Sequence, residues 1–389
     1  MSNKTEPRFQ TREVHGGVEP DPTTGAILTP IYQTTTYVQE SVDQYMDKGY
    51  SYSRSGNPTV VALEEKITSL ENGAGSACFA TGMAATSATM MALLNHGDHC
   101  ILSDVVYGGT HRLATYVLSR FGVNFSFIDT SNPVNVERAL RPETRLIFTE
   151  TPANPTLKLT DIAAISTISK EKGIPHVVDN TFLTPYFQRP LELGADISLH
   201  STTKFMEGHN ISVGGSITAN TKEMLESIKF VRNCLGSNMS PMVAFYTLQG
   251  CKTLSTRIRA QSENAARIAD FLTTHNAVDR VCYPGLDSFP QKELANRQAS
   301  GYGSMLWFEV KGGVEAGKQL MNTLKLWSLA ENLGSVESLV THSVTMTHAD
   351  IPREERMSVG ITDGLVRLST GLEAAEDLIS DLKQALDRL

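Results

Sequence analysis

A lysine stands just beyond the end of a predicted buried strand in the stretch Ala195–Lys204 (ADISLHSTTK). Ile197 and Leu199 alternate with polar residues, which predicts a strand, and hydroxyl residues separate that strand from Lys204. Burial disfavours the charged form of a lysine and lowers its pKa, so the amine can act as a nucleophile. Such an amine can form an imine with an aldehyde cofactor. The alternative is a solvated loop lysine without a chemical role.

Other residues would suit an aldehyde cofactor with a ring nitrogen and a phosphate, which is what pyridoxal phosphate carries. Asp179 ends an apolar strand and could pair with a protonated ring nitrogen, or it could cap the next turn. Gly82 and Met83 follow a strand at a helix start, where backbone amides can hold a phosphate, although small residues also occur there for packing reasons. Ser201 and Thr203 could donate to the same phosphate or cap a turn.

Aromatic and cationic side chains could complete such a site. Tyr107 follows a predicted strand and could stack its ring on the cofactor, or it could be a core tyrosine. Tyr52 and Arg54 could reach a phosphate across a subunit interface, or they could form an interface pair without a ligand. Arg367 alternates with apolar residues in a predicted strand and could hold a substrate carboxylate or form a structural salt bridge.

A regular alternation of strands and helices predicts where these residues lie. Such alternation is typical of a parallel sheet with helices on both faces, and ligands bind such sheets beyond the carboxyl ends of the strands. The predicted strands are Ser76–Ala80, His99–Ser103, Val123–Asp129, Arg145–Glu150, His176–Asp179 and Asp196–His200, with Gly215–Thr218 as a further candidate. The predicted helices between them are Gly82–Leu94, Tyr107–Arg120, Asn135–Leu140 and Asp161–Glu171.

The length of 389 residues predicts about two domains. Residues 1–57 lack a sustained period and are expected to form an extended arm that lies on another subunit. Residues 58–250 would form the cofactor-binding large domain of an α/β fold. Residues 251–389 would form a smaller α+β domain, with strands at Ser304–Val310 and Leu365–Ser369.

Composition and charge argue against several partners. The net charge of −8 is scattered without a basic stripe, so nucleic acid and anionic membrane are not expected partners. No apolar run approaches the roughly 20 residues of a membrane span, and the first residues lack the apolar core of a signal peptide. Five widely spaced cysteines fit reduced thiols and a cytoplasmic location. Because no metal-ligand spacing occurs, no metal is predicted.

Nine stretches form an ordered set along nearly the whole chain. They are YSRSGNPT (52–59), TGMAAT (81–86), VYGGTHR (106–112), ETPANP (150–155), VVDNTF (177–182), STTKF (201–205), ENLGSVESL (331–339), TMTHA (345–349) and VRLSTGLE (366–373). With this set, the chain resembles the pyridoxal-phosphate enzymes of cysteine and methionine metabolism, which include cystathionine γ-synthase, cystathionine γ-lyase, methionine γ-lyase and O-acylhomoserine sulfhydrylases. The resemblance implies the aspartate aminotransferase-like fold (fold type I) and a homotetramer built from tight dimers.

The resemblance also implies a role for each matching residue. Lys204 would carry pyridoxal 5'-phosphate as a Schiff base and move protons, and Tyr107 would stack on the ring and act as a base. Arg367 and Ser338 would hold the α-carboxylate of the substrate. The other implied cofactor contacts are Asp179 at the ring nitrogen, Asn154 at the ring hydroxyl, Gly82, Met83, Ser201 and Thr203 at the phosphate, and Tyr52 and Arg54 from the neighbouring subunit.

Residues at the expected substrate end are similar to those of cystathionine enzymes. Methionine γ-lyases that resemble this chain usually have Cys in place of Gly109 and lack the arginine that matches Arg112. Arg112 could hold a distal carboxylate, and Glu337 fits the same type. Ser51, however, stands where cystathionine enzymes commonly carry an acid for the distal amine, which puts cystathionine itself in doubt.

The chain departs from its relatives just after Lys204. Glu207 and the run His209-Asn210-Ile211 replace the usual Asn-Gly-His-Ser/Gly-Asp pattern, and Phe205 replaces a common Tyr. The expected activity is γ-elimination on a sulfur-containing or homoserine-derived amino acid, of the cystathionine γ-lyase type, which releases a 2-oxo acid, ammonia and a thiol. The alternatives are γ-replacement by a cystathionine γ-synthase or sulfhydrylase, a methionine γ-lyase or related enzyme with an unusual substrate, and a protein that keeps the fold without turnover.

Overall fold

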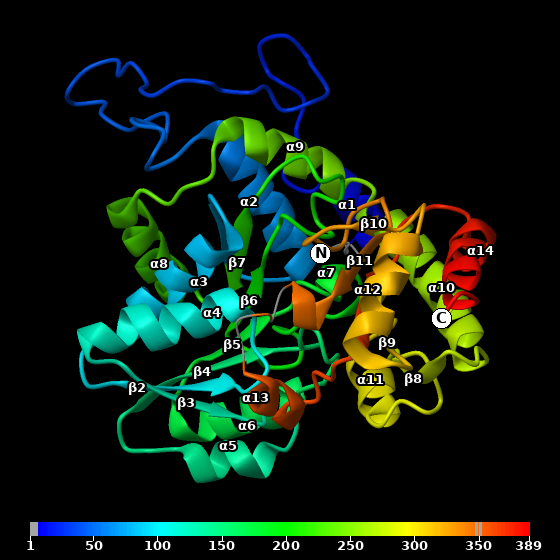
Figure 1. Cartoon of the computed structure of the whole chain (residues 1–389). Helices are drawn as coiled ribbons and strands as arrows, with labels where there is room; N and C mark the ends of the chain where they lie inside the picture. Colours follow the sequence, from blue (N-terminus) through cyan, green and yellow to red (C-terminus); the bar gives the residue numbers. More distant parts are fainter. Residues whose placement is uncertain (1–6, 347–348, 350–351) are drawn as a thin grey trace.

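The computed structural model describes residues 7–346, 349 and 352–389 (Figure 1), so Thr347 and His348 of the TMTHA stretch lie outside the described residues. A seven-stranded sheet has the order β1-β7-β6-β5-β4-β2-β3. Strands β2 to β6 run parallel to one another, whereas β7 is antiparallel to both β6 and β1. The predicted α/β fold with a mostly parallel sheet is confirmed. The strands are β1 Gly75–Phe79, β2 His99–Ser103, β3 Asn124–Ile128, β4 Thr144–Glu150, β5 His176–Asp179, β6 Ile197–His200 and β7 Gly215–Ala219.

Helices cover both faces of this sheet because successive strand residues point to opposite sides. Leu102 and Phe148 pack against α3 and α8, whereas Ile101 and Ile147, one residue earlier, pack against α5 and α6. The helices of this part are α2 Pro58–Glu71, α3 Gly82–Leu93, α4 Gly108–Arg112, α5 Pro133–Ala139, α6 Ile162–Lys172, α7 Thr184–Phe187, α8 Lys222–Leu235 and α9 Pro241–Cys251.

The predicted helix Tyr107–Arg120 differs from the structure. It begins as α4, continues as the π-helix η1 (Leu113–Val117) and ends as the 3-10 helix η2 (Leu118–Phe121). Buried Ala114 and Leu118 are four residues apart, so they can share one buried face whether the backbone between them is an α-helix or a π-helix. Apolar periodicity therefore predicts a helical segment here but not its pitch.

A second sheet lies in the C-terminal part of the chain, beside the first (Figure 1), and has the order β10-β11-β12-β9-β8. The two predicted strands are present as β9 Met305–Val310 and β12 Leu365–Ser369. Short β8 Val278–Cys282, β10 Ser328–Leu329 and β11 Leu339–His342 were not predicted, since none shows a clear alternation. The domain boundary near residue 250 stays a prediction. The helices of this part are α10 Leu254–Thr273, α11 Lys292–Gln298, α12 Gly313–Thr323, α13 Arg353–Ser358 and α14 Ala375–Leu386, with the 3-10 turn η3 Ser343–Thr345.

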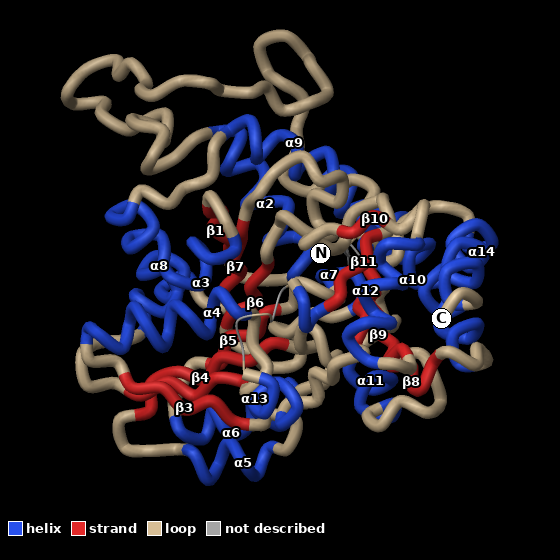
Figure 2. Tube along the Cα trace, in the orientation of Figure 1, coloured by secondary structure: helices blue, strands red, loops and turns tan. Residues whose placement is uncertain are grey.

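The predicted N-terminal arm is extended only in its second part. Residues Phe9–His15 form α1, and the buried Glu13 carboxylate accepts hydrogen bonds from the Ser255 amide (2.9 Å) and hydroxyl (2.6 Å) at the start of α10. Residues 16–57, all of them described, contain an isolated bridge between Thr36 and Tyr52 but no helix or strand. This segment runs as a long loop away from the body of the molecule (Figure 2).

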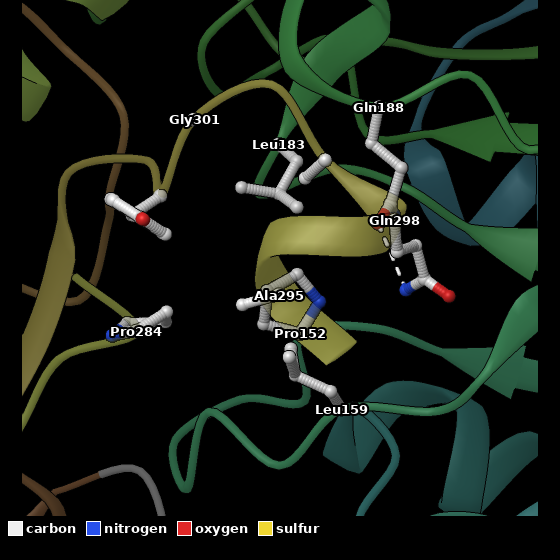
Figure 3. A pocket seen from close by; sticks show the side chains of 10 residues that line it. Pro152, Leu159, Leu183, Gln188, Pro284, Ala295, Gln298 and Gly301 are labelled. Atoms are coloured by element: carbon white, nitrogen blue, oxygen red, sulfur yellow. Dashed lines mark hydrogen bonds between the residues drawn. The ribbon is translucent and has the colours of Figure 1, made fainter. Parts of the chain in front are cut away.

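Side chains between the two sheets anchor the loop that follows β4. Gln298 of α11 donates to Gln188 Oε1 and to the Thr160 carbonyl, each at 3.0 Å, and Gln188 donates to the Thr151 carbonyl at 3.2 Å. Figure 3 shows Gln188 and Gln298 beside a small apolar cavity. Its volume of about 10 Å³ is at the limit for a single water, so it is a packing defect and not a ligand site.

Candidate active site

A cavity of about 380 Å³ lies beyond the carboxyl ends of β4, β5 and β6 and reaches β12 of the second sheet. Its place agrees with the rule that parallel sheets bind ligands at this edge. The structure therefore brings together side chains that are distant in the sequence. The predicted site residues that line this cavity are Gly82, Met83, Tyr107, Arg112, Asn154, Asp179, Ser201, Thr203, Lys204 and Arg367.

The Lys204 amine is held in the wall of this cavity. Its Nζ donates a hydrogen bond to Asn332 Oδ1, on the loop before β11. Burial, and secondarily the Arg367 charge, lower the pKa of Lys204 to about 8. An amine with this pKa is partly uncharged near neutral pH, as a nucleophile or a proton acceptor must be.

A low pKa alone does not identify the reactive lysine. Lys66 in α2 is fully buried, and burial lowers its pKa to about 8 as well. Its Nζ donates to the carbonyls of Glu13 (2.7 Å) and Val14 (3.3 Å), and it is not among the residues that line the cavity. Lys204 is distinguished by its access to the cavity.

Two carboxylates, buried Glu150 and half-buried Asp179, lie side by side in the lining of the cavity. Asp179 Oδ1 accepts from the Thr181 amide at 3.0 Å and hydroxyl at 2.5 Å, and Glu150 is its register partner on β4. Burial raises the pKa of Asp179, and burial with the nearby Asp179 charge raises the pKa of Glu150 to about 8. A cationic group between them would relieve this cost, as a protonated ring nitrogen would.

Glu150 lies at a predicted strand end, but its role in the site was not predicted from the sequence. Its two carboxylate oxygens accept hydrogen bonds from the amides of Tyr107 (2.7 Å) and Asn154 (3.0 Å), so it fixes the backbone of both residues. The signal was available, since Glu150 ends one strand as Asp179 ends the next. Asn332, in contrast, lies in a loop with no local pattern that points to Lys204.

The start of α3 presents free donors to the cavity. Thr81 Oγ1 caps the helix by accepting from the Ala84 amide at 2.9 Å, which leaves the amides of Gly82 and Met83 without an intrahelical acceptor. A Cβ on residue 82 would lie 2.9 Å from Ser201 Cβ, so glycine is required for this approach. This end of the cavity suits a phosphate group.

The hydroxyl of Thr203 is engaged with the backbone of Gly214. It donates to the carbonyl at 3.2 Å and accepts from the amide at 3.0 Å. The hydroxyl is therefore already oriented by the chain, while Ser201 beside it also faces the cavity.

Arg367 supplies a buried cation at the other side of the cavity. Its Nη1 donates to Asn154 Oδ1 at 2.8 Å, and its Nη2 donates to Thr341 Oγ1 at 3.0 Å and to the Asn332 carbonyl at 3.1 Å. Burial lowers the pKa of Arg367 to about 10, so it stays charged at neutral pH. Its buried Nε has no hydrogen-bond partner among the described residues, which favours a role in holding an anion.

Tyr52 and Arg54 lie outside this cavity. Arg54 Nη1 donates to the Asn233 carbonyl (2.8 Å) and to Asn233 Oδ1 (3.0 Å) in α8, and its guanidinium lies 5.5 Å from the centre of the Tyr52 ring. That Tyr52 and Arg54 contact the cofactor of a neighbouring subunit stays a prediction.

Three residues predicted at the substrate end are also placed away from the cavity lining. Ser338 is buried, and its hydroxyl donates to the Glu373 carboxylate at 2.7 Å and accepts from the Gly371 amide at 2.8 Å. Glu337 accepts from Asn210 Nδ2 at 2.9 Å. The Ser51 carbonyl accepts from the Tyr37 amide at 3.1 Å within the arm.

This donor set fits pyridoxal phosphate. The carboxylates of Glu150 and Asp179 would offset a ring cation, and the Lys204 amine would be available to an aldehyde. The first amides of α3 suit a phosphate, and Arg367 remains for a substrate carboxylate. Among the described residues, no cluster of His, Cys, Asp or Glu side chains could hold a metal ion. No helix in the described ranges is long and apolar enough to span a bilayer.

The model of the Cys/Met metabolism PLP-dependent enzyme family matches residues 10–387. The chain belongs to this family. Its cofactor is therefore pyridoxal phosphate, and it is an enzyme of the PLP-dependent carbon–sulfur lyase group that acts on amino acids.

Relatives in this family carry different activity names at similar identity. The chain is 48% identical to a cystathionine γ-lyase of Bacillus subtilis and 47% identical to a cystathionine β-lyase of Lactococcus lactis subsp. cremoris, each over 98% of this chain and 99% of the relative. A solved cystathionine γ-lyase of Lactobacillus plantarum, complexed with L-serine, superposes with a TM-score of 0.94 at 40% identity, over 98% of this chain and 99% of that one. The predicted type I fold is confirmed.

Proposed function

We propose that this enzyme cleaves cystathionine by γ-elimination and releases cysteine, 2-oxobutanoate and ammonia. The observation that carries this proposal is the presence of two arginines from different elements in one cavity, buried Arg367 on β12 and exposed Arg112 at the end of α4. Cystathionine has a carboxylate at each end, and a guanidinium can hold each one.

The side chains that line the cavity have different roles in this reaction. Bound pyridoxal phosphate supplies an electron sink for charge that develops on the substrate carbon. The Lys204 amine, with its pKa near 8, takes the proton from Cα and delivers a proton back to the reacting skeleton. Asp179 would hold negative charge for a protonated ring nitrogen, and Arg367 would bind the α-carboxylate of the substrate and so orient its Cα toward the amine.

β-Elimination is a second candidate, because a cystathionine β-lyase is nearly as similar to the chain as a cystathionine γ-lyase. The two reactions use the same residues and differ in the C–S bond that breaks. γ-Replacement on an O-acylhomoserine and methionine γ-lysis also remain alternatives, because Ser51 lacks the acid that commonly meets the distal amine of cystathionine.

The products of cystathionine cleavage distinguish these reactions. The enzyme is incubated with cystathionine, and the oxo acid and thiol are identified by mass spectrometry. We expect 2-oxobutanoate with cysteine. Pyruvate with homocysteine would identify a β-lyase, whereas turnover only of an O-acylhomoserine, with oxo acid suppressed by added cysteine, would identify a replacement enzyme.

We also propose that the enzyme acts as a cytoplasmic homotetramer in which Tyr52 and Arg54 complete the phosphate site of a neighbour. The arm exposes Ile27, Val38 and Val42, with 78%, 89% and 92% of each residue accessible, and a neighbouring subunit would cover such apolar side chains. Light scattering should give a tetramer mass, and Arg54→Ala should weaken cofactor binding. A fully active monomer would contradict this assembly.

A further inference from the structure

Four side chains form a hydrogen-bonded chain that runs from the reactive lysine in the cavity to the exposed Glu337 outside its lining. Lys204 Nζ donates to Asn332 Oδ1, Asn332 Nδ2 donates to Asn210 Oδ1 at 2.6 Å, and Asn210 Nδ2 donates to Glu337 Oε2 at 2.9 Å. The four residues come from the turn after β6 and from the loop before β11.

The chain has a fixed direction. A carboxylate only accepts hydrogen bonds, so Glu337 requires the nitrogen of Asn210 to face it. The Asn210 oxygen then faces Asn332 and requires its nitrogen, which leaves the Asn332 oxygen toward Lys204. Without these partners, the Asn332 amide could turn its nitrogen toward the lysine, where it could not accept a hydrogen bond from the charged amine.

The loop that carries Asn210 is built to present this side chain. Asn210 has a φ of 57°, in the left-handed region that asparagine tolerates better than most residues. The buried Glu207 carboxylate accepts from the amides of His209 (3.2 Å) and Ile211 (3.1 Å), on either side of Asn210. The Gly208 carbonyl accepts from the Val336 amide at 2.9 Å, which ties this loop to the segment of Glu337.

We propose that Asn210 and Glu337 are positioning residues for Lys204, because they hold the Asn332 amide with its oxygen toward the amine. The proposal rests on the role of Lys204 given above. It also explains a local departure of this chain: Glu207 and Asn210, which differ from the usual pattern, form one support for the lysine. When the amine is not joined to the cofactor, this support keeps it at the cavity wall.

Other charges near Lys204 must be separated from the effect of the chain. The titratable and charged groups that line the same cavity are Tyr107, Arg112, Glu150, Asp179, Glu331 and Arg367. None of these is altered by a substitution at residue 210. Replacing Asn210 by leucine removes no charge, so a change in Lys204 would report the lost orientation of the amide.

The test measures the apparent pKa of Lys204 in the full-length chain after removal of the cofactor. Limited reductive methylation at a series of pH values is followed by mass spectrometry of the Lys204 peptide. We expect a wild-type value of about 8, and a value lower by about half to one pH unit in Asn210→Leu, because the charged amine loses a correctly oriented acceptor. Asn210→Asp, measured in 1 M salt to screen its repulsion of Glu337, should show no such fall, because a carboxylate at this position still accepts from Asn332.

Glu337→Gln provides an independent test. An amide at position 337 no longer fixes the orientation of the Asn210 side chain, so we expect the pKa of Lys204 to fall. This fall should persist in 1 M salt, where the through-space effect of an exposed charge is screened. Asn220→Leu is the matched control, since Asn220 bonds Asp196 elsewhere on the surface; it should leave the value unchanged. Circular dichroism verifies that each variant is folded.

A second readout uses the holoenzyme. Asn210→Leu should lower kcat with little change in KM, since the substrate contacts are intact, and Asn210→Asp should restore most of kcat. An unchanged Lys204 pKa in folded Asn210→Leu, or an equal fall in Asn210→Asp, would overturn the proposal. Because the titration uses no substrate, it stands apart from the cystathionine assay, and a wild-type Lys204 that did not titrate near 8 would instead refute its proposed role.

Discussion

Glu150 and Asp179 are register partners at the ends of the parallel strands β4 and β5, so two neighbouring carboxylates, one buried and one half-buried, face one cavity. Each side chain also anchors backbone: Asp179 holds Thr181, and Glu150 holds Tyr107 and Asn154. The pair combines a counter-charge for the cofactor with a scaffold for the residues around it.

The raised pKa of Glu150 predicts a pH-dependent stability of the cofactor-free chain. The carboxyl titrates near 4.5 when unfolded and near 8 when folded. Between these values the folded state keeps a proton that the unfolded state has lost, so this group's contribution to stability falls as pH rises from 4.5 to 8. Thermal unfolding of wild type and Glu150→Gln should show a smaller decrease in Tm over this window for the variant. The exposed residue Glu143 provides the control, since Glu143→Gln should follow the wild-type dependence of Tm on pH. The same dependence in Glu150→Gln as in the wild type would contradict the raised pKa.

Arg112 should discriminate between substrates. Arg112→Ala should lower kcat/KM for cystathionine by about tenfold to a hundredfold, the effect of losing one charge-assisted hydrogen bond, and should change methionine turnover little. Arg120→Ala, an exposed arginine of η2, is the control. An equal loss on both substrates would show that Arg112 supports the cavity without contacting a distal carboxylate.

Gly109 should set the position that the Tyr107 ring takes in this chain. A Cβ on residue 109 would lie 2.5 Å from Tyr107 Cε1, whereas one on residue 108 would meet the flexible end of Arg112 at 3.3 Å. Gly109→Ala should therefore lower kcat/KM by about tenfold or more, because small displacements of active-site groups are costly. Gly108→Ala should have a smaller effect in the same assay. Equal activities would mean that the Tyr107 ring moves without consequence.

The strand ends could be predicted from the sequence because their signals are local. Asp179 and Lys204 each follow a short apolar strand, and Gly82 stands where a strand meets a helix, so the sheet rule alone brings them to one edge. Arg367 reaches the same cavity from the second sheet, and its place there came from a family resemblance, since no local pattern links residues so far apart.

Other parts depend on tertiary contacts that local patterns do not carry. Helix α1 has only seven residues, so its apolar period is too short to detect, and it is held by the hydrogen bond from Ser255 of α10 to its Glu13. Ser338 resembles a substrate contact in sequence, yet its hydroxyl is bonded to Glu373 and Gly371. The link from Lys204 through Asn332 to Asn210 joins two loops, and only the folded chain places them together.

The most direct test of the account is to locate the bound cofactor. The purified holoenzyme is reduced with borohydride and digested, and the peptide that gains the mass of the reduced cofactor is sequenced by mass spectrometry. We predict that the added mass lies on Lys204 and is absent from Lys204→Ala. Cofactor on another lysine, such as Lys66 with its equally low pKa, would contradict the assignment of the active site.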